Sequence, residues 1–188
     1  INTSLTGHGK NPDQQIPHTI DWVFQWAGDA GLLIAAIKLV EDARNVKHDT
    51  DTAGVQVILV VEDGIDAYSN FLSMLYPELL NHSGSLIAEG LNRFHRLLRM
   101  RARPKIVLAL DYEQGMLLFE RHADHISALM SDIRIPRGGD IDPRGGIRLA
   151  KQIRQLKPEL PILFQSAETD LAALAEPFGA AHLVKKSH

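Results

Sequence analysis

The sequence of 188 residues contains no cysteine, which excludes disulfide bonds, cysteine-ligated zinc sites and thiol catalysis. Such a chain fits a reducing compartment, and we expect a cytoplasmic protein. Long hydrophobic runs are also missing. The most apolar stretch, residues 30–40, is far too short to cross a bilayer and includes Lys38, and residues 1–10 lack the pattern of a signal peptide. We therefore expect no contact with a membrane.

An excess of positive charge is missing as well, because 20 Lys and Arg residues stand against 23 Asp and Glu, for a formal net charge of −3. This balance provides no bulk attraction to nucleic acid, so nucleic acid is not expected as a partner. One basic run, from Arg93 to Lys105, is interleaved with leucines. That spacing favours an amphipathic helix with a solvated cationic face, with a protein-partner contact as the alternative.

What the sequence does have is a core-forming composition and a regular alternation of elements. Hydrophobic residues make up 45% of the chain, and its length suits one domain, or one domain with an appendage. From residue 55 onward, short apolar runs alternate with helical patterns, which indicates buried parallel strands joined by right-handed crossovers. The five predicted strands are Val55–Val61, Lys105–Leu110, Ile126–Ser131, Pro161–Gln165 and Ala181–Val184.

The intervening segments predict helices on both faces of this sheet. A long helical region covers residues 66–101, with Pro77 and residues 81–84 as expected kinks or a break. The Gly- and Pro-rich residues 135–146 predict a loop. The fold class is therefore α/β, with a doubly wound five-stranded parallel sheet of order 2-1-3-4-5. The shorter helices are predicted at 112–121, 147–156 and 170–178.

The N-terminal part of the chain predicts a small appendage. Residues 1–19 are rich in Gly, Pro and polar side chains and predict a loop, whereas residues 20–26 alternate as a strand does. A helix is expected from about Ala30 to Arg44, and the polar run of residues 42–54 predicts a linker. One strand and one helix are too small to bury a core of their own.

Chemistry-bearing side chains lie at the carboxyl ends of four predicted strands. Glu62 and Asp63 close the first strand, Asp132 closes the third, Ser166 the fourth and Lys185 the fifth. Since the carboxyl ends of parallel strands share one edge of a sheet, we expect these groups to meet in one crevice. Clustered carboxylates repel one another unless a cation lies between them, and Mg²⁺ is the simplest hard ion with oxygen ligands.

This set of groups is typical of phosphoryl transfer. Asp132 is the candidate nucleophile and would form an aspartyl-phosphate, while Lys185 and Ser166 would contact the transferred phosphoryl oxygens. Each of these residues alone is more often a turn residue, a helix cap or a solvated strand end. Their occurrence together, in order at four strand ends, favours the functional interpretation.

The ordered segments VILVVED, MSDIRIP, LPILFQSAE and GAAHLVKK resemble a response-regulator receiver domain of the CheY-like type, over residues 55–186. The resemblance implies that Glu62 and Asp63 are the acidic metal-binding pair and that Asp132 is the phospho-acceptor. It also implies that the backbone carbonyl of Arg134 is a metal ligand. Arg134 lies two residues after the acceptor, at a position that tends to tune dephosphorylation in this family.

Two further residues match the family pattern and two depart from it. Ser166 takes the place of the Thr or Ser near the phosphoryl group, and Lys185 that of the lysine. Lys186 stands where receivers usually have Pro. His182 stands where a Tyr or Phe commonly acts as a rotamer switch, so the usual coupling between hydroxyl and aromatic ring is not expected in its usual form.

The length of the stretch between the first two strands resembles receivers at the front of large bacterial multidomain proteins that carry phosphotransfer or kinase-like modules. The N-terminal piece resembles the last strand and helix of a preceding receiver-like unit. We therefore expect residues 1–54 to be the end of such a unit and residues 55–188 to be a receiver that lacks its last helix. The N-terminal helix would then pack in the place of that missing helix and bury Leu33, Ile34 and Ile37.

The function implied by the resemblance is a phosphorylation-dependent module of a two-component signalling system, which is no enzyme beyond its own phosphorylation and dephosphorylation. Expected partners are a histidine kinase or phosphotransfer protein, other domains of a longer polypeptide, and a second copy in a homodimer. Two alternatives stay open. One is a phosphohydrolase of the haloacid-dehalogenase type, although Arg134 stands where those enzymes place a second acid. The other is a degenerate receiver that docks partners without being phosphorylated.

Three further groups of residues have weaker functional interpretations. The run His122–His125 has a spacing that a metal could use, but a solvated helix end is favoured. Asp140 and Asp142 could supplement the metal site, although the Gly pair beside them favours a turn. Trp22 and Trp26 are expected in the core or at a dimer contact.

Overall fold

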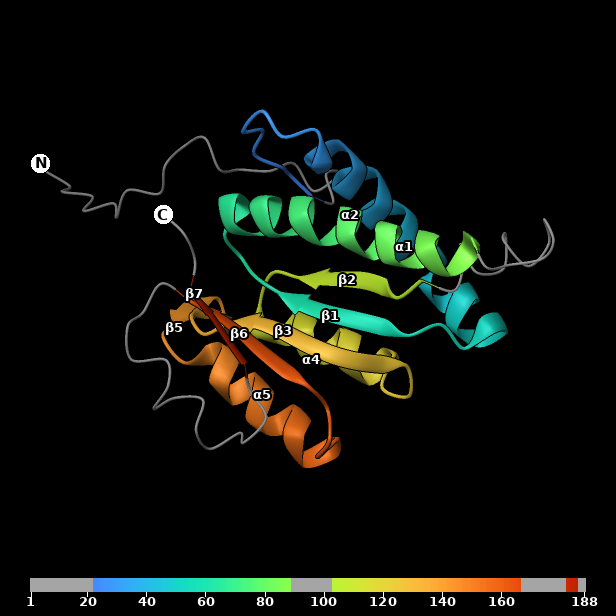
Figure 1. Ribbon diagram of the computed structural model, residues 1–188. Coiled ribbons are helices and arrows are strands. Elements are labelled where there is room, and N and C mark those ends of the chain that lie inside the picture. The colour runs from blue at the N-terminus through green and yellow to red at the C-terminus, as the bar shows by residue number, and fades with distance from the viewer. Residues whose placement is uncertain (1–21, 89–102, 167–181, 186–188) are drawn as a thin grey trace, which may run out of the picture.

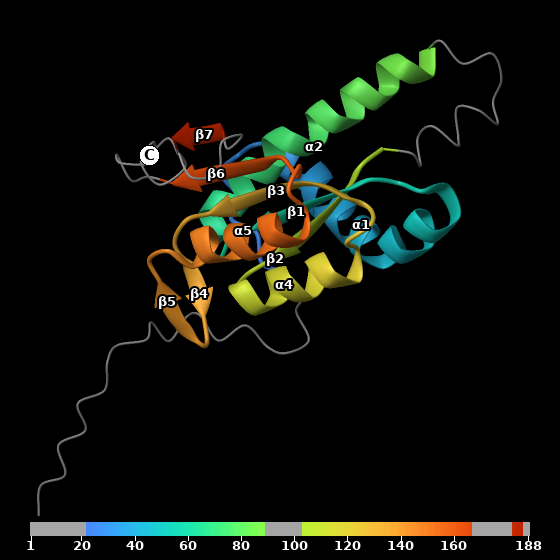
Figure 2. The same cartoon turned by 90° about the horizontal axis from the view of Figure 1, so that it is seen from below.

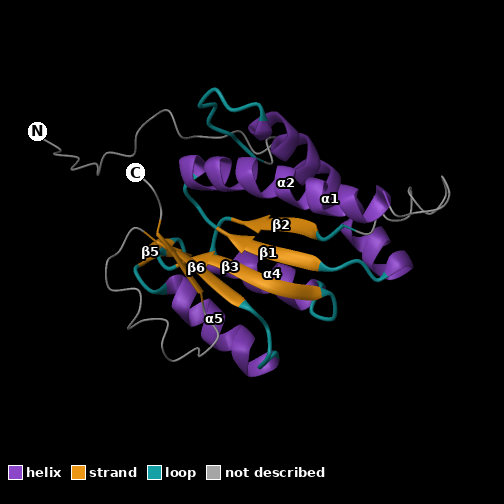
Figure 3. Cartoon of the chain, in the orientation of Figure 1, coloured by secondary structure: helices purple, strands orange, loops and turns teal. Residues whose placement is uncertain are grey.

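The computed structural model describes residues 22–88, 103–166 and 182–185 (Figure 1). Five parallel strands form one sheet between helical layers, in the spatial order β2-β1-β3-β6-β7 (Figure 1, Figure 3). Because β6 and β7 are the fourth and fifth predicted strands, this order confirms the doubly wound 2-1-3-4-5 sheet. The strands are β1 (Val57–Val61), β2 (Lys105–Ala109), β3 (Ile126–Asp132), β6 (Ile162–Ser166) and β7 (His182–Lys185).

In the part of the chain that the structure describes, helices cover both faces of the sheet (Figure 1, Figure 2). One face carries α1 (Gly31–Ala53) and α2 (Ile65–Ala88), and the other carries α4 (Tyr112–Arg121) and α5 (Gly145–Leu156). The predicted bounds of α4 are confirmed. The predicted helix at 170–178 lies outside the described residues.

The central strand β1 is apolar along its whole length because helices cover it on both sides. Val57, Leu59 and Val61 belong to the core cluster with α4 and α5, whereas Ile58 and Val60 pack with α1 and α2. A strand buried on both faces has no polar side to alternate with the apolar one. This double burial is why a continuous apolar run predicted the strand correctly.

Helix α2 is continuous where a break was expected. Residues 81–84 are helical, and Pro77 lies inside the helix, so the predicted break is wrong. The Ser83 hydroxyl donates a hydrogen bond of 2.7 Å to the carbonyl of Leu79, a bond that a helical backbone accommodates. In Figure 2, α2 extends well past the sheet. The end of the predicted helical region, 89–101, lies outside the described residues.

Helix α1 continues through the segment that was predicted to be a linker, so that prediction is wrong. The polar residues of this segment are part of the packed helix: Asp42 and Asp49 are buried and form ion pairs with Arg103 and Lys105. The helix ends at Gly54, whose φ of 61° lies in the left-handed region that glycine adopts without steric cost. The charged residues that suggested a linker therefore fix the helix in place.

The segment before α1 is not a strand in residues 22–26, so the predicted strand is wrong for its described part. This segment lies against α2 instead, where the ring of Phe24 meets the ring of Tyr68 edge-on with 5.8 Å between centroids. Trp22 packs at the border of the core, as expected. Trp26, by contrast, is largely exposed.

The apolar residues that α1 was expected to bury are exposed. The exposed fractions are 57% for Leu33, 41% for Ile34 and 67% for Ile37, which contradicts the prediction that the helix covers them in the place of a missing last helix. Helix α1 instead packs its other side, including Ala35 and Leu39, against α2 and β2. The division of the chain at residue 54 stays a prediction.

A β-hairpin was not expected and replaces part of the predicted loop after the third strand. Strand β4 (Ile135–Arg137) pairs antiparallel with β5 (Asp140–Asp142) through a turn at Gly138 and Gly139. Both glycines have positive φ, 63° and 90°, as the tightest hairpin turns require. The hairpin projects from the helical layer of α4 and α5 (Figure 2).

None of the described helices combines the length and the apolar composition needed to cross a membrane.

Candidate functional site

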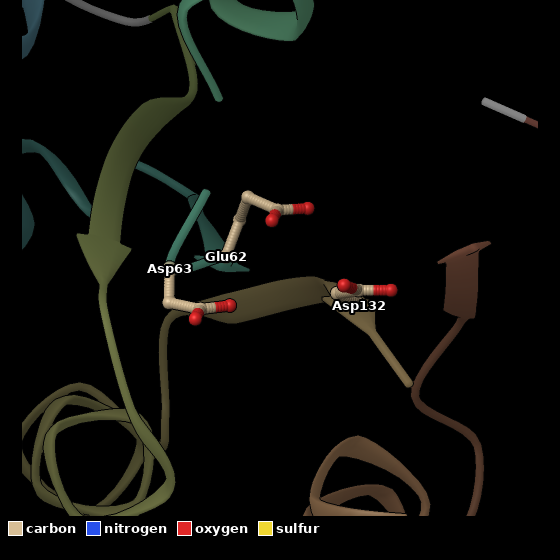
Figure 4. Close-up of side chains that lie close together, drawn as sticks. All are labelled: Glu62, Asp63 and Asp132. Atoms are coloured by element: carbon tan, nitrogen blue, oxygen red, sulfur yellow. The ribbon is translucent and has the colours of Figure 1, made fainter. Parts of the chain in front are cut away.

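Two neighbouring strands bring three carboxylates together at the carboxyl edge of the sheet. Strands β1 and β3 pair in register, with Val61 opposite Ser131, so the next residues along each strand emerge side by side. Glu62, Asp63 and Asp132 each offer an oxygen, and these oxygens all lie within 4.8 Å of one another (Figure 4). The predicted convergence of the three carboxylates is confirmed.

Local hydrogen bonds fix the backbone at these strand ends. The N–H of Glu62 donates to the carbonyl of Ala109 at 3.0 Å, which extends the pairing of β1 with β2 by one residue. The carboxylate of Glu62, which is buried, accepts a bond of 3.1 Å from the N–H of Gly64. Asp132 accepts a bond of 2.8 Å from the N–H of Ile133. The carboxylates of Glu62 and Asp132 are therefore each held by the turn that follows their own strand.

A close approach of two backbones holds the Asp132 peptide against the start of α5. A Cβ atom built on Gly146 would lie 1.8 Å from the carbonyl oxygen of Asp132 and 2.8 Å from the hydroxyl oxygen of Ser131. The N–H of Gly146 donates to the carbonyl of Ile133 at 2.9 Å, and the Ser131 hydroxyl donates to the Asp132 carbonyl at 2.8 Å. Only glycine fits here, and this close approach sets the position of the end of β3.

The donor set fits a hard divalent cation. Three carboxylates crowded within 4.8 Å repel one another, and a cation between them removes that cost. Carboxylate oxygens are the ligands that Mg²⁺ prefers, and two or three of them leave positions for phosphoryl oxygens. Arg134, whose carbonyl is the predicted main-chain ligand, lies in the turn directly after Asp132, between two fully buried isoleucines, Ile133 and Ile135.

The backbone places the two remaining predicted site residues at the same edge of the sheet. Asp132 pairs with Gln165 across β3 and β6, and Ser166 pairs with Lys185 across β6 and β7. Ser166 and Lys185 are thus the last residues of their strands, as predicted. Their side chains, and that of His182 at the start of β7, lie outside the described part of the structure, as does Lys186.

The weaker candidate groups do not join this cluster. Asp142 accepts hydrogen bonds from the N–H of Arg144 at 2.9 Å and from the guanidinium of Arg148 at 3.0 Å, and both lower its pKa. His122 is buried instead of lying at a solvated helix end, and burial lowers its pKa. Among the described residues, the group with metal-ligand geometry is Glu62, Asp63 and Asp132.

The basic run predicted to be solvated is buried where the structure describes it. Arg103 and Lys105 are 3% and 2% exposed and pair with carboxylates of α1. The rest of the run, residues 93–101, lies outside the described part of the chain. Arg103 and Lys105 therefore serve the fold and are not available to a partner.

Comparison with known proteins gives structural similarity only. No protein-family model matches the chain, and no curated protein matches it. A response-regulator receiver domain protein from Clostridium thermocellum is 20% identical, over 71% of this chain and 84% of that one, with a TM-score of 0.45.

Two further solved structures are similar to this chain at comparably low identity. The chemotaxis protein CheY4 of Vibrio cholerae is 17% identical, over 71% of this chain and 88% of that one, with a TM-score of 0.43. A complex of CheX with CheY, BeF₃ and Mg²⁺ from Borrelia burgdorferi is 17% identical, over 78% and 88%, with a TM-score of 0.48.

Identities and TM-scores this low do not assign a function, so the assignment rests on the chain itself. Its parallel sheet has the order in which the first and third strands are neighbours at the switch point, where ligands bind in such folds. Its acidic cluster lies at that point. By its own strand order, this chain has a doubly wound, flavodoxin-like fold, with the acidic cluster at its switch point.

Proposed function

We propose that the chain is a phosphoacceptor receiver module of a phosphorelay, which takes a phosphoryl group on Asp132 with Mg²⁺ bound by Glu62, Asp63 and Asp132. The observation that carries this proposal is the convergence of the three carboxylates within 4.8 Å at the switch point of the sheet. Three like charges at one place repel one another, and a cation bound between them would offset that cost.

The proposed chemistry needs little more than a positioned carboxylate. An oxygen of Asp132 attacks the phosphorus of a phosphohistidine, so that an O–P bond forms while the N–P bond breaks and the leaving imidazole takes up a proton. Mg²⁺ supplies neutralisation of the charge on the phosphoryl oxygens. Asp132 is half-buried, which leaves its carboxylate accessible from the edge of the sheet.

Ser166 and Lys185 complete the proposal from their places in the sheet. Both stand last in their strands and pair with each other in register, beside the strand end that carries Asp132. From there a hydroxyl and an ammonium group can contact the oxygens of a phosphoryl group on Asp132. The Arg134 carbonyl is proposed as the main-chain metal ligand, because it lies two residues after Asp132 in the turn that ends β3.

The phosphohydrolase alternative needs a general acid two residues after the nucleophile. Arg134 occupies that position, and its guanidinium cannot release a proton at the pH of a cell. The observed site thus favours a stoichiometric phosphoacceptor over a phosphatase that turns over. The degenerate receiver stays the second alternative, and only modification of the protein distinguishes it.

The test is incubation with acetyl phosphate and Mg²⁺, followed by intact mass spectrometry, with beryllofluoride binding as a second probe. We expect modification of the wild-type chain that needs Mg²⁺ and is lost in Asp132→Asn. A matched control is Asp140→Asn, which removes an exposed carboxylate from the same loop and should leave modification intact. Continuous release of phosphate from p-nitrophenyl phosphate would instead support the hydrolase, and no response to either probe would support the degenerate receiver.

Partners and location follow from this role as proposals. The phosphoryl donor would be a histidine kinase or a phosphotransfer protein, and the site of action the cytoplasm. Further domains of a longer polypeptide or a second copy of the chain would receive the signal, through a shift between two conformations of the loops after β3 and β6.

A further inference from the structure

The β4–β5 hairpin lies directly between the proposed acceptor and α5. Strand β4 begins three residues after Asp132, and β5 ends three residues before Gly145, where α5 starts. The only residues between Asp132 and β4 are Ile133 and Arg134, which include the proposed main-chain metal ligand. Any displacement of the hairpin must therefore be absorbed by these two residues or transmitted to the metal site.

The base of the hairpin is packed tightly. Ile133 and Ile135 are fully buried in the core cluster. A Cβ atom on Gly145 would lie 2.7 Å from the Cγ1 atom of Ile135 and 2.8 Å from its carbonyl oxygen, so β4 and the start of α5 are in direct contact.

The tip of the hairpin is held by the first turn of α4. The N–H of Gly138 donates a hydrogen bond of 3.1 Å to a carboxylate oxygen of Glu113. The guanidinium of Arg137 lies over the ring of Tyr112, 4.8 Å from its centroid, a cation–π distance. These residues are 25 positions apart in sequence, so the contacts tie together two separate elements of the fold.

Tyr112 also connects this contact to α5. Its hydroxyl donates a hydrogen bond to the side-chain oxygen of Gln152. On the other strand of the hairpin, Asp142 accepts a bond of 3.0 Å from the guanidinium of Arg148 in α5. The hairpin is thus held at its base, at its tip and along its second strand by two helices.

We infer that Tyr112, Glu113 and Arg137 are positioning residues for the metal site: by clamping the hairpin tip to α4, they hold the Arg134 peptide in its metal-binding orientation. This inference rests on the proposed function. Ordering the backbone of one residue costs a free energy that corresponds to about a fivefold to tenfold change in a dissociation constant or more. A hairpin that is already clamped does not incur that cost when Mg²⁺ binds.

The contacts of Glu113 and Arg137 suit this role because both side chains are exposed, whereas the ring of Tyr112 is half-buried against the core cluster. An exposed hydrogen bond or cation–π contact adds little to global stability, so loss of the Glu113 or Arg137 side chain should leave the fold intact. Their effect is expected in the local order of residues 133–142 and in the affinity for the metal. Global stability and metal affinity can therefore be separated by experiment.

The experiment compares three clamp variants, Glu113→Ala, Tyr112→Leu and Arg137→Gln, with two matched controls. Tyr112→Phe keeps the ring beneath Arg137 and loses only the hydroxyl bond to Gln152. Glu120→Ala removes an exposed carboxylate from the same helix without touching the hairpin. The readouts are the Kd for Mg²⁺ by calorimetry, beryllofluoride binding in the presence of Mg²⁺, thermal melting, and amide hydrogen exchange of the metal-free protein.

We expect the Kd for Mg²⁺ to rise about fivefold to tenfold in each clamp variant, with the melting temperature unchanged in Glu113→Ala and Arg137→Gln. In the metal-free clamp variants, exchange should be faster at Gly138 and at residues 133–135, and both controls should match the wild type. Tyr112→Leu combined with Arg137→Gln should weaken Mg²⁺ binding no more than either change alone, because both remove the same contact.

Two results overturn these claims separately. If the wild-type chain and all three clamp variants bind Mg²⁺ with the same Kd, the inference fails and the proposed function stands. If the wild-type chain binds neither Mg²⁺ nor beryllofluoride, the proposed function fails, and the assignment of the clamp to a metal site fails with it.

Discussion

Two clusters of charged side chains in this molecule are built on opposite plans. At the outer edge of β2, Asp42 and Asp49 of α1 meet Arg103 and Lys105, so two negative charges are balanced by two positive ones. At the carboxyl edge of β1 and β3, three carboxylates lie together. The first cluster is internally neutral and the second carries an excess of one sign.

The buried cluster is satisfied by the protein itself. Asp42, which is completely buried, accepts bonds from the Arg103 guanidinium at 2.5 and 2.8 Å, from the Tyr76 hydroxyl at 3.0 Å and from the backbone N–H of Ile106 at 3.0 Å. A carboxylate with so many donors has no capacity left for a ligand. The acidic cluster differs in charge, because its three carboxylates carry an excess of negative charge that a cation would offset.

The largest expected effect comes from breaking the balanced cluster. Asp42→Ala leaves the Arg103 guanidinium and the Ile106 N–H buried without their main partner, which should cost about 3–5 kcal/mol of unfolding free energy. Urea unfolding measures it. The control is Asp51→Ala, which removes an exposed pair with Lys47 and should cost less than about 1 kcal/mol. If the two variants lost similar amounts of unfolding free energy, the buried ion pairs of Asp42 would not stabilise the fold more than an exposed pair does.

The acidic cluster should respond with the opposite sign. Asp63→Asn removes one of three mutually repelling charges, so the metal-free protein should gain about 1 kcal/mol of stability. In the wild type, Mg²⁺ at about 100 times its Kd should raise the unfolding free energy by about 2.7 kcal/mol, and the variant should lose most of that gain. Thermal melting with and without Mg²⁺ measures both. If the metal-free Asp63→Asn protein were less stable than the metal-free wild type, the three carboxylates would not destabilise the fold by repulsion.

The position of the acidic cluster depends on a glycine, and this dependence can be tested separately. Gly146→Ala places a methyl group against the Asp132 carbonyl, where the nearest atom is backbone and cannot turn away, so we expect a loss of about 2 kcal/mol together with weaker Mg²⁺ binding. The control is Gly115→Ala in α4, whose new methyl group would meet side-chain methyl groups of Leu149 and Val61 at 3.1 Å or more, not backbone. Equal effects of the two changes on Mg²⁺ binding would contradict the role of Gly146.

The smallest effect concerns the alkaline limit of the balanced cluster. Burial, and then the charge of Asp42, raise the pKa of Tyr76 above its ordinary value of 10.0. The unfolded chain therefore releases this proton above pH 10 while the folded chain keeps it, so stability should fall as pH rises above 10. Tyr76→Phe should cost about 1 kcal/mol at neutral pH and flatten this fall. The measurement is the free energy of unfolding of the wild type and the variant from pH 8 to 11. If stability falls equally steeply with pH in both proteins, Tyr76 is not the group responsible.

The elements that the sequence predicted well are those whose signal is local. Strand β1 is a continuous apolar run, and the acidic pair Glu62 and Asp63 follows it directly, so both the strand and the position of the cluster could be inferred. Helix α4 begins after Asp111, whose carboxylate caps the helix by accepting the N–H of Gln114 at 2.7 Å. Neither inference requires knowledge of a distant residue.

The features that sequence reasoning missed depend on distant partners. The buried positions of α1 repeat at alternating spacings of three and four, but two of them are aspartates, whose partners lie about sixty positions later. Without Arg103 and Lys105 in view, that pattern is typical of a solvated linker. The buried positions that define it are Ala35, Leu39, Asp42, Val46 and Asp49.

The hairpin shows the same limit in a different way. The pair Gly138–Gly139 between short polar–apolar stretches is a turn signal that could have predicted it. What no local pattern contains is the contact of its tip with Tyr112 and Glu113. The side chains of Ser166 and Lys185 lie outside the described residues, so their predicted roles stay predictions.

The bond between Asp42 and the Ile106 N–H has a consequence for how the molecule meets other molecules. Strand β2 borders the sheet, and its outward-facing backbone groups are the kind that recruit a foreign strand. Helix α1 and its aspartate already occupy that border. A second strand could pair with β2 at this edge only if α1 were displaced first. The buried ion pair of Asp42 with Arg103, which stabilises the fold, therefore also protects this edge against strand pairing.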